Sequence, residues 1–170
     1  MFAQRRLLAF VVLVLVMILV LAPAWFFLAP GYTDLLAGAG NALAPSGITM
    51  RAVGNSIVVQ SAEQSTPITI ASLAFQAGLF LVLILVLATP GLGVRRRLAY
   101  VAAAAALTFG LHVVGVLTMG IRTRALRPVI VLVGSVGIDA VPILIWGILC
   151  ARYWWPALKG QEAAQSEQPE

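Results

Sequence analysis

The sequence predicts an all-α membrane protein, a four-span transmembrane helix bundle with a small extracytoplasmic helix and β-hairpin segment. Of its 170 residues, 61% are hydrophobic and 10% are charged, and its mean hydropathy is +1.01. Soluble domains are about 45–50% apolar and about 25% charged. Four apolar runs, residues 7–28, 68–89, 98–120 and 129–150, each reach the length of about 20 residues that a spanning helix needs. We therefore expect an integral membrane domain over residues 1–158 and a disordered, acidic cytoplasmic tail over residues 159–170.

The first run also has the features of a secretory signal. Arg5 and Arg6 precede it, and Ala22-Pro23-Ala24 resembles a cleavage site that would remove residues 1–24. However, the apolar stretch continues to Leu28, and a proline is awkward beside a scissile bond. We favour a retained span.

An outer loop over residues 29–67 follows the first span. Pro30-Gly31 opens it, and residues 35–43 can form a short amphipathic helix at the membrane interface. Residues 48–62 contain two β-branched runs around Gly54-Asn55, which is the pattern of a small hairpin. An isolated hairpin is marginal in water, so this one must pack on the span ends or on a partner protein.

The remaining spans carry three polar side chains at similar depth. At ~1.5 Å per residue, Gln76 and His112 lie ~12 Å and Asp139 lies ~15 Å from the outer surface. Ionisable groups inside a membrane face the bundle interior and pair with one another, so we expect a cluster of these three residues. It can be structural glue, which we favour, or a proton- or ion-responsive site.

Basic residues set the expected orientation. With both termini in the cytoplasm, seven Lys and Arg residues lie inside and four lie outside, as the positive-inside rule favours. The four outer residues are Arg51, Arg122, Arg124 and Arg127. They can anchor to lipid headgroups or dock an anionic group of a partner. No basic motif for nucleic acid accompanies them.

The residues give no support for catalysis, a metal or a cofactor. Cys150, the only cysteine, is expected at the inner end of the last span, roughly 20 Å in depth from His112 at ~1.5 Å per residue. It is therefore expected to fill space and cannot act as a nucleophile with that base. One histidine cannot supply the three or four ligands of a zinc site. We expect no enzyme activity.

Three segments together resemble a known family. They are the hairpin "RAVGNSIVVQSA", the span ending "GLFLVLILVLATPG" before Arg95, and the last span "DAVPILIWGILCARYWW" with its Pro-x-x-x-Trp pattern. This order resembles the exosortase H-associated membrane proteins of bacteria. The resemblance implies a bacterial inner-membrane protein that assists an exosortase-type protein-sorting system, without an active-site residue of its own.

Three functions remain open at this point. The first is a non-enzymatic accessory or scaffold subunit with a membrane protein partner. The second is a small structural subunit of a respiratory or photosynthetic membrane complex. The third is a proton- or ion-coupled transport module that uses His112 and Asp139.

Overall fold

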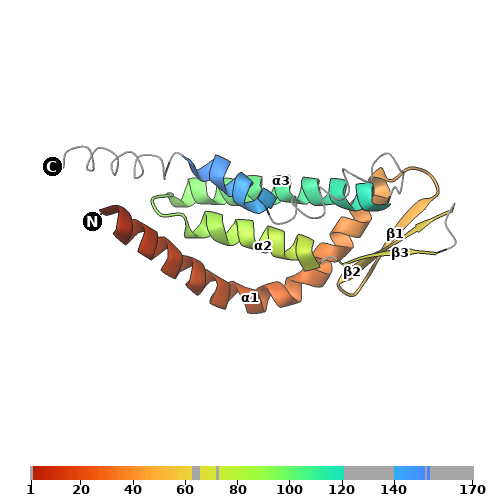
Figure 1. The fold of residues 1–170 in the computed structure, drawn as a ribbon, viewed down its shortest axis with the longest axis horizontal. Helices are drawn as coiled ribbons and strands as arrows, with labels where there is room; N and C mark the ends of the chain where they lie inside the picture. The colour runs from red at the N-terminus through yellow and green to blue at the C-terminus, as the bar shows by residue number, and fades with distance from the viewer. Residues whose placement is uncertain (1, 63–65, 72, 121–139, 152, 154–170) are drawn as a thin grey trace, which may run out of the picture.

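Four helices and a small sheet make up the part of the chain that the computed structural model describes, residues 2–62, 66–71, 73–120, 140–151 and 153. The helices are α1 (Phe2–Leu43), α2 (Leu73–Ala88), α3 (Val94–Gly120) and a fourth, which we call the C-terminal helix (Ala140–Ala151). Strands β1 (Ile48–Val53), β2 (Ser56–Ser61) and β3 (Ile68–Ala71) lie between α1 and α2 in the chain. The helices run side by side, with the sheet at one end and the start of α1 at the other (Figure 1).

Helix α1 is longer than expected. The outer loop was predicted to begin at residue 29, but residues 29–43 continue the helix that starts at Phe2. Pro23 and Pro30 both lie inside it, because prolines within apolar helices are tolerated when neighbouring groups satisfy the freed backbone. Its 42 residues would extend ~63 Å if straight, twice the ~30 Å of a hydrocarbon core. The helix is bent near its middle (Figure 1), as prolines induce.

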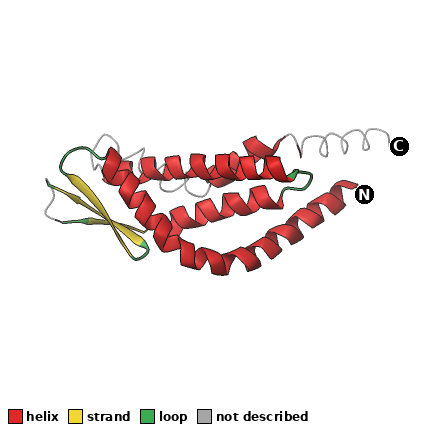
Figure 2. Ribbon diagram, turned by 180° about the vertical axis from the view of Figure 1, so that it is seen from behind, coloured by secondary structure: helices red, strands yellow, loops and turns green. Residues whose placement is uncertain are grey.

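The hairpin predicted over residues 48–62 is present (Figure 2). Strands β1 and β2 are antiparallel, with Val53 paired to Ser56 across the two-residue turn Gly54-Asn55. Gly54 has a φ of 56° and Asn55 does not have a positive φ, as in a type II′ turn, where glycine takes the first central position.

Strand β3 corrects the second predicted span. Residues 68–71 were assigned to a helix, but they pair with β2 in antiparallel register, Ile57 opposite Ile70. Ile68-Thr69-Ile70 is β-branched and follows Pro67, so it fits a strand well. The sheet order is β1-β2-β3. Helix α2 consequently has 16 residues instead of 22, or ~24 Å at 1.5 Å per residue.

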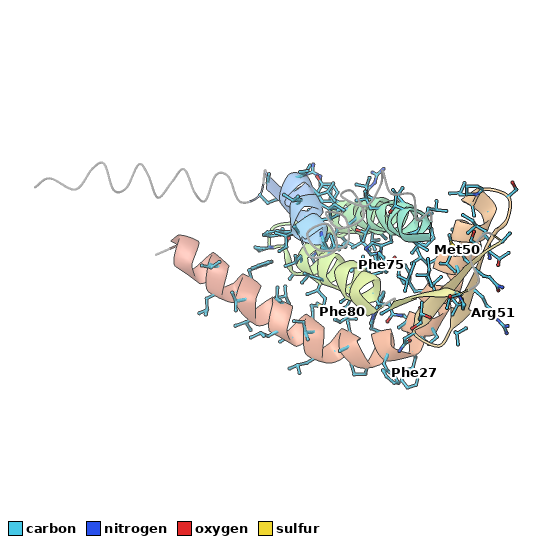
Figure 3. All side chains as sticks on the ribbon, turned by 45° about the vertical axis from the view of Figure 1, so that its right-hand side comes forward. Phe27, Met50, Arg51, Phe75 and Phe80 are labelled. Atoms are coloured by element: carbon cyan, nitrogen blue, oxygen red, sulfur yellow. The ribbon has the colours of Figure 1, made fainter. Side chains whose placement is uncertain are left out.

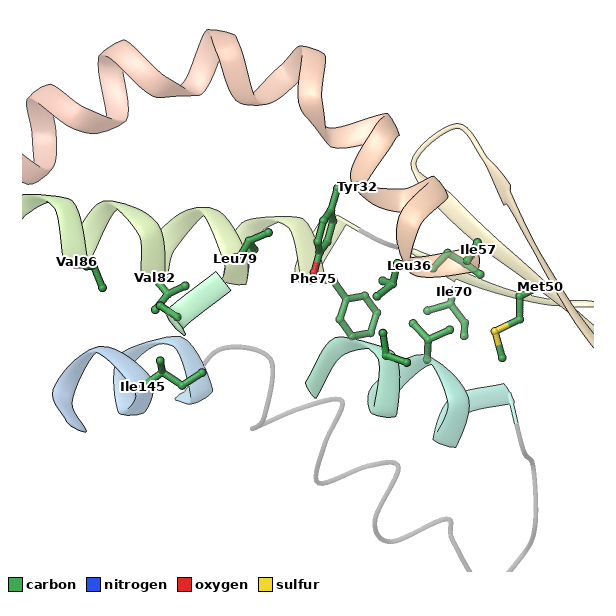
Figure 4. Close-up of a cluster of buried hydrophobic side chains, with 14 of the residues drawn as sticks. Tyr32, Leu36, Met50, Ile57, Ile70, Phe75, Leu79, Val82, Val86 and Ile145 are labelled. Carbon is green, nitrogen blue, oxygen red and sulfur yellow. The ribbon is translucent and has the colours of Figure 1, made fainter. Parts of the chain in front are cut away.

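Helix α2 is the central element of the bundle. Phe75, Val82 and Val86 on one side of the helix and Ile84 on the opposite side are each at most 1% exposed. This agrees with an apolar composition that has no polar face. The buried cluster runs from the sheet along α2 to Ile145 of the C-terminal helix (Figure 4).

Among the described residues, two helices are long and apolar enough to cross a membrane, within Leu7–Leu43 of α1 and Val94–Thr118 of α3. Helix α2 and the C-terminal helix are apolar but shorter. Along α1, Phe26, Phe27 and Leu28 are 75%, 80% and 62% exposed, and Phe27 points away from the other helices (Figure 3). Consecutive residues point about 100° apart around a helix, so α1 is apolar on its outer surface in several directions.

Some predicted residues lie outside the described part of the chain. These are Asp139, Arg122, Arg124, Arg127, residues 129–138 of the fourth predicted span, and the tail 159–170. The third predicted span, residues 98–120, lies within α3, which begins four residues earlier at Val94.

Candidate functional site

A buried polar cluster lies near the sheet end of the bundle, where α1, α2 and α3 meet. His112 of α3 is 4% exposed, and its Nδ1 lies 2.5 Å from the hydroxyl oxygen of Tyr32 on α1. A phenol can donate or accept, and a neutral imidazole has one nitrogen of each kind, so either side chain can be the donor in this hydrogen bond. Phe75 of α2 packs its ring edge-on against the imidazole at 5.0 Å between centroids, which keeps the pair in apolar surroundings.

Gln76 makes the second half of this cluster. It is 2% exposed, and its Nε2 donates to Thr33 Oγ1 at 2.8 Å and to the Ala29 carbonyl at 3.3 Å. The Thr33 hydroxyl in turn donates to the same Ala29 carbonyl at 3.1 Å. The Ala29 carbonyl, in the peptide bond before Pro30, thus accepts hydrogen bonds both from its own helix and from α2.

The structure places Gln76 and His112 in the same buried region, but each bonds to α1. Sequence reasoning expected them to pair with each other and with Asp139, which lies outside the described residues. It missed Tyr32 and Thr33, because Pro30-Gly31 was interpreted as the end of the helix. Two features of the sequence could have indicated these residues. Tyr32 and Thr33 lie in an apolar context, and Thr33 is four residues after Ala29, the helical spacing at which a threonine hydroxyl bonds the earlier carbonyl.

Gln76 is the fourth residue of α2, so it lies ~4.5 Å along the helix axis from the helix start at 1.5 Å per residue. The described partners of this cluster are hydroxyl, amide and carbonyl groups, which carry no charge. Such interhelical contacts contribute about 0.6 kcal/mol each on average in membranes. The cluster therefore joins α1 to α2 and α3 through uncharged hydrogen bonds.

A side chain closes one edge of the sheet. Strand β1 is an edge strand, and Met50 directs its backbone groups away from β2. The Asn41 amide of α1 meets both groups: its Nδ2 donates to the Met50 carbonyl at 2.5 Å, and the Met50 N–H donates to its Oδ1 at 2.6 Å. The side-chain amide therefore takes the place of a neighbouring strand and joins the sheet to the end of α1.

The opposite edge, β3, is open among the described residues. Ile57 pairs with Ile70 and Val59 with Ile68, so the alternation of an antiparallel ladder directs the backbone groups of Thr69 outward. No hydrogen bond to them is found within residues 2–62, 66–71, 73–120 and 140–151.

The two faces of the sheet also differ. Met50, Ile57, Val59 and Ile70 are at most 7% exposed and pack toward α1. On the other face, Thr49, Arg51, Gln60 and Thr69 are exposed. Arg51 points away from the body of the protein (Figure 3). Of the four candidate docking arginines, Arg51 is the one that the structure describes.

A third polar group joins the helices at the end opposite the sheet. Thr89, just beyond α2, has a buried hydroxyl that accepts from Trp146 Nε1 at 2.9 Å and donates to the Leu85 carbonyl at 2.7 Å. Cys150 is fully buried there, with its Sγ 3.6 Å from the same hydroxyl. The cysteine is thus a packing residue at the far end of the bundle from the sheet. Trp146 also stacks on Phe10 of α1, at 5.6 Å between ring centroids.

Comparison with protein-family models, with curated proteins and with solved structures gives no match to this chain.

Proposed function

We propose that this chain is a non-enzymatic accessory subunit of the bacterial inner membrane that holds a partner protein through its three-stranded sheet. The observation that carries the proposal is the asymmetry of the sheet. One edge is closed by Asn41, while the backbone of Thr69 on the other edge points outward. An open edge is a template on which an extended segment of another chain adds as a strand.

Membrane insertion is supported by the surface of α1. Large apolar exposed areas are unfavourable in water, and Phe26, Phe27 and Leu28 are all more than 60% exposed. In our proposal α1 and α3 cross the bilayer, and α2 and the C-terminal helix complete a four-helix, multi-pass bundle.

The proposed orientation has both termini in the cytoplasm and the sheet outside. Exposed Arg95 and Arg96 lie at the start of α3, at the end of the bundle opposite the sheet. This is the end at which α1 begins (Figure 1). Arg5 and Arg6 of α1 and Arg95 to Arg97 of α3 therefore lie at the same end, which supports this orientation by the positive-inside rule.

The accessory role agrees better with the polar cluster than transport does. A proton pathway needs groups that change charge and pass protons on. His112 bonds to the hydroxyl of Tyr32, and Gln76 bonds to Thr33 and Ala29. These contacts hold α1 against α2 and α3, and so fix the helix end that carries Asn41.

The proposed partner is a component of an exosortase-type sorting system, and this part rests on the sequence resemblance. The exposed face of the sheet offers Arg51, which can bind a carboxylate of the partner. The alternative partner is a respiratory or photosynthetic complex, in which this chain would be a structural subunit.

The test compares two substitutions at one position of the open edge. Thr69→Pro removes the outward N–H that an added strand would bond, and edge strands tolerate proline. Thr69→Val keeps the N–H and the β-branched shape. Tagged full-length chains are expressed in native membranes, extracted in mild detergent, and their retained proteins identified by mass spectrometry.

We expect wild type and Thr69→Val to retain the same stoichiometric membrane partner and Thr69→Pro to lose it. Amide exchange of β1 and β2 must stay unchanged in Thr69→Pro, which excludes loss of the sheet. Full retention by Thr69→Pro would refute strand addition, and a solitary wild-type chain would refute the accessory role. Energy-transducing subunits in place of a sorting component would establish the alternative partner.

A further inference from the structure

The first turn of α3 contains three consecutive arginines, which have two different environments in the structure. Helix α3 begins at Val94, and its first intrahelical bond runs from the Arg97 N–H to the Gly93 carbonyl at 2.9 Å. Gly93 is therefore the N-cap and supplies no side-chain oxygen to the helix start. No acidic residue lies in the first turn, which holds Arg95, Arg96 and Arg97 instead.

Arg97 is held inside the protein. It is half-buried, and its Nη2 donates to the Thr89 carbonyl at 3.2 Å. That carbonyl belongs to the end of α2, where unpaired carbonyls and the negative end of the helix dipole favour a cation. Arg97 thus caps the preceding helix, and its charge has a partner within the chain.

Arg95 and Arg96 have a different setting. Both are exposed, and they lie at the positive end of the α3 dipole, where a cation is disfavoured. The exposed carboxylate of Asp34 is not their partner, because it belongs to the half of α1 nearer the sheet, away from the start of α3. Within the described part of the chain, neither guanidinium forms a salt bridge, and both are exposed to a ligand.

Apolar side chains flank these two arginines. Val94 is 74% exposed and Leu98 is 63% exposed, immediately before and after the arginine run. Leu98 is four residues after Val94, so the two lie on the same side of α3, one turn apart. Arg95 lies about 60° around the helix from Leu98, and Arg96 lies a further 100° around, so the four exposed side chains surround the start of α3. A ligand that fits them carries an anionic group for the arginines and apolar chains for the valine and the leucine.

We propose that this surface, Val94, Arg95, Arg96 and Leu98, binds the headgroup and upper acyl chains of an anionic phospholipid. The proposal rests on the membrane location proposed above, because it places the start of α3 at the cytoplasmic interface. The phosphate meets Arg95 and Arg96, and the net negative charge of the lipid distinguishes it from a zwitterionic one. Arg97 is excluded from the site, since its Nη2 is already bound to Thr89.

The experiment uses the full-length chain in detergent and measures bound lipid by native mass spectrometry. Phosphatidylglycerol competes with phosphatidylethanolamine of the same chain length. We expect Arg95→Gln with Arg96→Gln to lower the preference for phosphatidylglycerol about 30-fold, since each arginine near an anionic headgroup contributes about 1 kcal/mol. Arg95→Lys with Arg96→Lys should keep most of the preference. Arg97→Gln should lower the melting temperature and leave the preference unchanged.

Several outcomes would overturn the proposal. One is an unchanged preference in the double glutamine variant, and another is a preference lost only with Arg97→Gln. A large gain in phosphatidylglycerol binding on deleting residues 160–170 would show that the acidic tail of the chain occupies the site. Equal displacement by millimolar inorganic phosphate would show a free-anion site. The membrane proposal fails separately, if carbonate washing releases the wild-type chain from native membranes.

Discussion

Replacing Asn41 with alanine tests whether a single side chain joins the sheet to α1. The Asn41 amide makes two hydrogen bonds to the backbone of Met50, at 2.5 and 2.6 Å. Each such bond contributes about 1 kcal/mol net, so their loss costs about 2 kcal/mol by that value. Alanine returns about 0.5 kcal/mol because it favours the helix more than asparagine does. The expected net loss of about 1.5 kcal/mol corresponds to about a tenfold rise in local opening.

The assay is hydrogen–deuterium exchange of the full-length protein in detergent, resolved at the Met50 amide. We expect about tenfold faster exchange at Met50 in Asn41→Ala, by the 1.4 kcal/mol per tenfold conversion. Asn41→Asp keeps an oxygen for the Met50 N–H but cannot donate to the Met50 carbonyl. The exchange rate of its Met50 amide should therefore lie between those of wild type and Asn41→Ala. The Val58 amide, which points toward β1 inside the sheet, serves as the reference. Equal Met50 exchange in wild type and Asn41→Ala would refute the bracing role.

Three further predictions concern the helix contacts and the hairpin turn. Tyr32→Phe removes the hydroxyl bound to His112 and should destabilise the bundle by up to about 1.7 kcal/mol in detergent unfolding; an unchanged stability would mean that the contact contributes nothing. Gly54→Ala places a side chain at a φ of 56° and should cost about 1–2 kcal/mol, measured as faster amide exchange in β1 and β2; unaltered exchange there would contradict it. Trp146→Phe loses the N–H bound to Thr89 but keeps an aromatic ring, so the stability measured by thermal unfolding should fall by about 0.6 kcal/mol. A loss several times larger would show that ring packing, and not the hydrogen bond, causes the effect.

The hairpin could be predicted because its signals are local. Gly54-Asn55 determines the turn, and the β-branched residues on either side fit paired strands. The burial of Gln76 and His112 could also be anticipated, because polar side chains in apolar helices turn inward. Their partners could not be, since they depend on how far α1 extends.

Two predictions were wrong, the helical start of the second span and the end of the first helix at Pro30, and both depended on local sequence alone. Ile68-Thr69-Ile70 continues into an apolar helix, and periodicity alone cannot separate a short buried strand from a helix turn. Pro30 was interpreted as a helix end, which is its usual effect in water. Here, Ala29 keeps hydrogen bonds from Thr33 and Gln76, and α1 continues to Leu43.

The order of the strands has a consequence for how the protein assembles. All pairings in the sheet join neighbours in the chain, and the widest ones, Ile48 to Ser61 and Ser56 to Ala71, close loops of fewer than twenty residues. Short loops cost little entropy and form early. Asn41 lies seven residues before β1, so the sheet and its hydrogen bonds to Asn41 can be complete once residue 71 has been synthesised. Helix α3, with His112, then packs against a sheet that is already formed, and the open edge of β3 forms during synthesis before the bundle is closed.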